Sequence, residues 1–81
     1  MLKQTIKDCK EELKVLARAE ESLRTVLSVS YTNGADLDFL EKIDHTLVAL
    51  LERVAYVNNV KAQCHRKLEE TGKLAKSLEL A

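Results

Sequence analysis

Apolar residues recur at alternating steps of three and four along residues 37–68, the spacing of a helix that packs against another helix. The positions of this stripe are Leu40, Ile43, Leu47, Leu50, Val54, Val57, Lys61, Cys64 and Leu68. The beginning of the chain repeats the spacing at Leu2, Ile6, Cys9, Leu13, Leu16, Glu20, Leu23 and Leu27. The sequence therefore predicts two long amphipathic helices, over residues 2–31 and 37–71.

Asn33-Gly34 lies between the two stripes and predicts a turn over residues 32–36. Both residues tolerate the left-handed backbone that closes a helix, and Asp36 or Asp38 is expected to cap the helix that follows. A connection this short returns the chain antiparallel to itself. The predicted fold class is all-α, an antiparallel and coiled-coil-like helical hairpin.

Gly72 predicts the end of the second helix, because glycine commonly closes helices. Residues 73–81 are then expected to form a short third helix or a tail. The whole chain, residues 1–81, is expected to be one helical domain, since its length is near the lower limit for a chain with its own core.

The composition favours long helices and offers little for nucleic acid or membranes. The chain is 46% apolar and has no proline and two glycines, so few residues interrupt a helix. Its 13 basic and 13 acidic side chains cancel, so no net field attracts a polyanion. No apolar run is long enough to cross a bilayer. We expect a cytoplasmic protein without nucleic-acid or membrane partners.

Folding the hairpin separates the charges along its length. One end is expected to gather the bases Lys3, Lys7, Lys10, Lys14, Lys61, Arg66, Lys67, Lys73 and Lys76. The turn end is expected to gather the acids Asp36, Asp38, Glu41 and Asp44. Glu20 interrupts the first stripe. We expect Glu20 to point into solvent while Ala17 and Ala19 make the contact; the alternative is that it meets a cation of a partner.

The sequence offers no constellation for catalysis, a metal or a cofactor. His45 and His65 lie far apart on one helix, without the paired His or Cys spacings of metal sites. Cys9 and Cys64 fall on the apolar stripes and are expected to be reduced core residues. We therefore expect no enzyme, no catalytic residues, no cofactor and no small-molecule substrate.

A second apolar row on the second helix exceeds what a hairpin can bury. Val48, Leu51, Ala55 and Ala62 form this row beside the stripe, so the helix is apolar over more than one partner's width. The central part of the helix is therefore predicted to bind a partner. The predicted partner-binding residues are Leu47, Val48, Leu50, Leu51, Val54, Ala55 and Val57.

This surplus indicates a non-enzymatic helical protein-binding module. The first hypothesis is a small chaperone or co-chaperone that holds an apolar helix of another protein in a groove. The alternatives are a self-assembling structural protein that closes as a homodimeric four-helix bundle, and a small phage or bacterial inhibitor that blocks its target through a charged end.

Three features together resemble a known family: the turn Asn33-Gly34-Ala35-Asp36, Phe39 after it, and the Leu/Val-rich segment 47–57. The chain is similar, over residues 5–60, to the E-component co-chaperones of type III secretion needle subunits. The resemblance implies a partnership with a second, tetratricopeptide-like chaperone, the pair holding a needle subunit unpolymerised. The segment after Val60 has no counterpart in that family.

Overall fold

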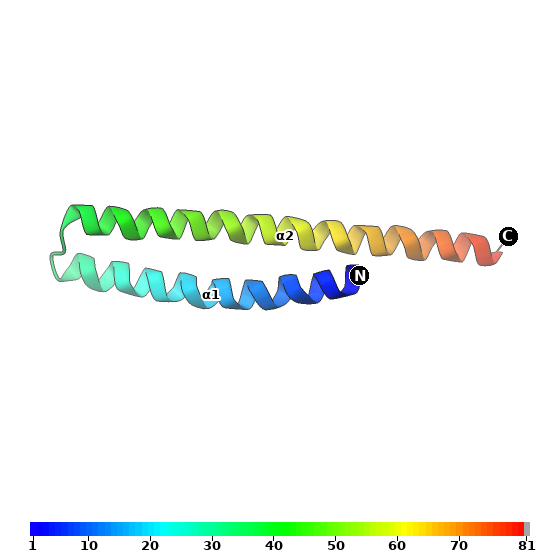
Figure 1. Ribbon diagram of the computed structural model, residues 1–81, viewed down its shortest axis with the longest axis horizontal. Helices are drawn as coiled ribbons and strands as arrows, with labels where there is room; N and C mark the ends of the chain where they lie inside the picture. Colours follow the sequence, from blue (N-terminus) through cyan, green and yellow to red (C-terminus); the bar gives the residue numbers. More distant parts are fainter. Residues whose placement is uncertain (81) are drawn as a thin grey trace.

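Two helices, packed antiparallel, make up the computed structural model, which describes the backbone of residues 1–80 and the side chains of residues 1–72. Helix α1 spans Leu2–Thr32 and helix α2 spans Leu37–Leu80. They form a rod of 70 × 16 × 15 Å in which α2 extends past the start of α1 (Figure 1). The predicted all-α antiparallel hairpin is confirmed.

The core is a single seam between the two helices. Its buried members are Ile6 and Cys9 of α1 and Ile43, Leu47, Val57 and Cys64 of α2. Among residues 1–72, all remaining positions of the two predicted stripes are half-buried, including Glu20 and Lys61. The alternating steps of three and four therefore identified the inner face of both helices, because this spacing keeps one side of a helix toward its neighbour.

The turn closes α1 through the backbone, as Asn33-Gly34 predicts. Gly34 has a positive φ of 71°. Its N–H donates to the carbonyl of Tyr31 at 3.2 Å, and the N–H of Ala35 donates to the carbonyl of Ser30 at 2.9 Å. These are the two bonds of a Schellman motif, which satisfies the last carbonyls of a helix.

Helix α2 starts directly after Asp36. The carbonyl of Asp36 accepts the first helical hydrogen bond, from the N–H of Leu40 at 3.1 Å, so Asp36 stands at the N-cap position. Asp38 lies inside the first turn. There its negative charge interacts favourably with the positive, N-terminal end of the helix dipole.

The predicted helix end at Gly72 is wrong, and within residues 1–80, whose backbone is described, no separate third helix follows it. Helix α2 continues through Gly72 to Leu80, and Gly72 has no positive φ. A glycine inside a helix costs only about 1 kcal/mol relative to alanine, so it does not end a helix unless the chain turns there. The side chains of the predicted third segment, residues 73–81, lie outside the described residues.

The two cysteines and Glu20 lie on the seam. Cys9 and Cys64 are buried and free, as expected of core thiols. Glu20 is half-buried and pairs with Arg24, one turn later in the same helix, at 2.9 Å. The cation beside Glu20 therefore comes from α1 itself, which neither sequence interpretation anticipated.

Candidate partner-binding surface

The structure divides the seven residues predicted to bind a partner into two groups. Leu47 and Val57 are 6% and 2% exposed, and Leu50 and Val54 are half-buried, so these four face α1. The other three, Val48, Leu51 and Ala55, are exposed. In the hairpin, only this second group is free to touch another molecule.

The exposed group belongs to a continuous line of residues along one flank of α2. We call Val48, Leu51, Ala55 and Ala62 the outer row; all four are exposed. Val48 is 47% exposed and Leu51 37%. The same steps of three and four extend the line toward the turn through Asp44 and Glu41. The outer row therefore repeats the spacing of a helix-packing seam on a side that α1 does not cover.

A groove at the turn end shows which side of α1 borders the outer row. Its walls are Arg24, Ser28 and Tyr31 of α1 and Leu37, Glu41 and Asp44 of α2. Glu41 and Asp44 are the residues that continue the outer row, so the groove and the row share one flank. Both Tyr31 and Leu37 are exposed apolar side chains.

The α1 edge of this flank becomes basic away from the turn. Steps of seven keep a residue on one side of a packed helix, and they lead back from Tyr31 and Arg24 to Ala17, Lys10 and Lys3. All five side chains are exposed. The outer row is therefore bordered by a small residue, Ala17, near its centre and by lysines toward the free end of the hairpin.

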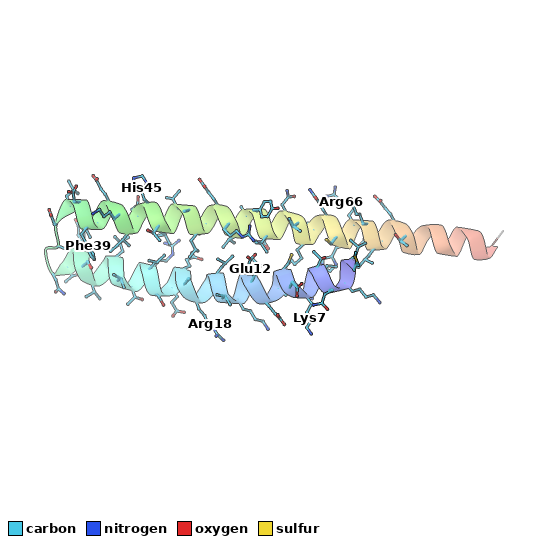
Figure 2. The ribbon with its side chains drawn as sticks, viewed as in Figure 1. Lys7, Glu12, Arg18, Phe39, His45 and Arg66 are labelled. Atoms are coloured by element: carbon cyan, nitrogen blue, oxygen red, sulfur yellow. The ribbon has the colours of Figure 1, made fainter. Side chains whose placement is uncertain are left out.

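The opposite flank is closed by an ion pair between the helices. Arg53 donates to Glu12, with a shortest distance of 2.8 Å, and its guanidinium lies 5.1 Å from the ring centroid of Tyr56. The hydrogen bond to Glu12 and its negative charge raise the pKa of Arg53. Figure 2 shows Glu12 between the two helices. Since Arg53 follows Leu51 by two residues, helical geometry places the two on opposite flanks of α2.

A second set of exposed apolar residues lies off the seam. Val15, Val26 and Val29 of α1 and Phe39 of α2 are all exposed. Tyr31 and Leu37 at the turn are exposed as well, and they were not among the predicted surface residues because they lie on neither predicted stripe. The hairpin register brings those two together, because the residues that face each other have numbers adding to about 67.

The hairpin has opposite net charges at its two ends. Residues 20–48, which form the turn half, carry six acidic and two basic side chains, a net charge of −4. The rest of the chain carries seven acidic and eleven basic ones, a net charge of +4. The neutral composition therefore conceals a dipole along the rod.

The two histidines lie apart on the surface of α2. His45 and His65 are both exposed, and Figure 2 shows His45 pointing away from α1. In this part of the chain, no three His, Cys, Asp or Glu side chains gather closely enough to hold a metal ion. None of the described helical residues forms a stretch long and apolar enough for a membrane span.

Comparison with protein-family models, with curated proteins and with solved structures found no match to this chain.

Proposed function

We propose that this protein is a non-enzymatic helical binding module that shields an apolar helix of a partner protein, as a small chaperone or co-chaperone does. The outer row of α2 is the surface that receives the helix. The observation that supports this proposal is the outer row itself, a second heptad-spaced apolar line left exposed after the hairpin has formed.

The chemistry of the outer row suits an apolar helix better than a flat or polar partner. Its large side chains, Val48 and Leu51, come first along α2 and its small ones, Ala55 and Ala62, follow. The small half leaves room for the side chains of an approaching helix. Leu47 and Val57 contribute indirectly, since they hold α2 against α1 and so keep the row straight. The partner helix is then expected to be apolar along one stripe and polar elsewhere.

The proposal includes a cytoplasmic location. Both cysteines are free and buried in the seam. Free thiols are typical of proteins in reducing compartments. The co-chaperone resemblance also implies a cytoplasmic site of action.

The test uses a synthetic amphipathic peptide of about three heptads, with leucine and alanine on its apolar stripe and a fluorescent label. Fluorescence anisotropy measures its binding to the native chain and to two variants. Ala55→Asp places a carboxylate on the outer row. Ala49→Asp is the matched control, because Ala49 is an exposed alanine of the same helix, one turn before Arg53 on the opposite flank.

We expect the native chain and Ala49→Asp to bind the peptide equally well. Ala55→Asp should weaken binding about tenfold or more, since its carboxylate would be desolvated under the peptide without a counter-charge. Equal binding by both variants, or a stronger loss with Ala49→Asp, would contradict the proposal. Circular dichroism of each variant checks that the hairpin is still helical.

A further inference from the structure

We propose that, without a partner protein, a second copy of this chain occupies the outer row, in antiparallel orientation and with the two-fold axis beside Leu51. This inference rests on the proposed function, because it assigns an occupant to the same surface. It predicts a homodimeric four-helix bundle from which a partner helix displaces one hairpin.

The outer row is self-complementary about Leu51. A two-fold axis there pairs residues of α2 whose numbers add to about 102, because each helix rises equally on both sides of the axis. Leu51 then meets Leu51 of the second copy, and Val48 meets Ala55 of the second copy. A large side chain thus faces a small one on either side of the central leucines, which favours close packing.

The charges select the antiparallel orientation. The turn half of the hairpin has a net charge of −4 and the other half +4. An antiparallel dimer centred on Leu51 places residues 37–48 of α2, with a net charge of −2, against residues 54–65 of the second copy, with a net charge of +1. A parallel dimer brings like charges together instead. Asp44 then faces Asn58 of the second copy, on the flank where α1 carries Lys10 and Lys3.

The exposed area is large enough for such an interface. The hairpin exposes 6528 Å², about a third more than the ~4900 Å² expected of a compact protein of this mass. A stable interface of ordinary size covers about 800 Å² on each partner. Dimerisation can therefore cover an interface of ordinary size without exhausting this surplus.

Disulfide trapping tests the orientation of the full chain. Three variants place single new cysteines along the proposed interface: Leu51→Cys, Asp44→Cys and Asn58→Cys. Each is oxidised mildly and examined by non-reducing electrophoresis and mass spectrometry, alone and as a mixture of Asp44→Cys with Asn58→Cys. The native chain is the control for Cys9 and Cys64, which are buried and should give no cross-link.

We expect Leu51→Cys to cross-link to itself and the mixture to form the 44–58 disulfide. Asp44→Cys alone should not react, because in the antiparallel dimer the two copies of that residue lie about 20 Å apart along the rod, beyond disulfide reach. Cross-linking of Asp44→Cys to itself without the 44–58 product would overturn the orientation.

No cross-link in any sample would overturn the second copy as the occupant. That result leaves the partner-helix proposal to the peptide titration, which has its own contradictory outcome. The peptide also connects the two proposals. Added before oxidation, it should reduce the yield of the Leu51→Cys cross-link in proportion to the fraction of hairpins that have bound it. A cross-link that the saturating peptide leaves unchanged would place the dimer contact elsewhere.

Discussion

Leu47 and Leu51 provide a direct test of the division between the inner face of α2 and its outer row. The two leucines lie one turn apart in the same helix, yet Leu47 is 6% exposed and Leu51 is 37% exposed. Replacing each by alanine removes the same atoms. The difference between the two variants therefore reports the difference in their surroundings.

The expected cost follows from the buried surface. Truncating leucine to alanine removes the equivalent of three methylene groups, worth about 2.4 kcal/mol when fully buried. For Leu47 nearly all of this burial free energy is lost and a cavity is left in the seam. Leu47→Ala should therefore destabilise the hairpin by about 3 kcal/mol. For Leu51 no cavity forms and alanine is the better helix former. Leu51→Ala should cost about 1 kcal/mol.

Urea unfolding followed by circular dichroism measures both effects. With a slope of about 1 kcal/mol per molar urea for a chain of this size, Leu47→Ala should lower the midpoint by about 3 M and Leu51→Ala by about 1 M. Repeating the titration at several protein concentrations separates folding from association, since only a dimer has a concentration-dependent midpoint. Equal losses at low concentration would refute the division between the two faces.

Three further predictions concern the turn, the end of the hairpin and the seam. Gly34→Ala should destabilise the protein by about 1 kcal/mol, because an L-residue is strained at the positive φ of this position. Gly72→Ala should instead stabilise the helix, because the backbone there is helical and the added Cβ meets open space. Thermal unfolding measures both variants, and a stability change of the same sign in both would contradict the assigned conformations. Cys9 and Cys64 should react with a thiol reagent far more slowly in the native protein than in urea, and equally fast reaction would show that the seam is open. Leu50→Asp should abolish the helical signal or the assembly, because an unpaired charge cannot be accommodated at the centre of the seam; full helicity and unchanged sedimentation would show that the seam lies elsewhere.

Periodicity was sufficient to predict the fold because both helices keep the 3,4 spacing along most of their length, with a charged residue only at Glu20 and at Lys61. The turn was predictable for a local reason, since Asn33-Gly34 provides the left-handed residue that a Schellman motif needs. Gly72 misled the prediction because glycine ends a helix only where the chain changes direction. The sequence alone could not distinguish these two glycines.

The candidate surface was predictable only in part. The second apolar row was evident from the sequence, but the predicted set also included Leu47 and Val57, which the hairpin uses for its own core. Which flank remains open depends on the side from which α1 packs, and this is a property of the pair of helices. The contact between Glu12 and Arg53 shows which flank of α2 is covered by α1. These two residues are far apart in the sequence, so no local pattern predicts their contact.

Sedimentation equilibrium of three chains shows whether helices pack on the outer row of α2. The native protein, Ala49→Asp and Ala55→Asp are compared over roughly a hundredfold range of concentration, with helicity recorded in parallel. If helices pack on the outer row, the native chain and Ala49→Asp form a concentration-dependent dimer, and Ala55→Asp is a helical monomer. Dimers that persist in Ala55→Asp but dissociate in Ala49→Asp would contradict it and assign the contact to the opposite flank.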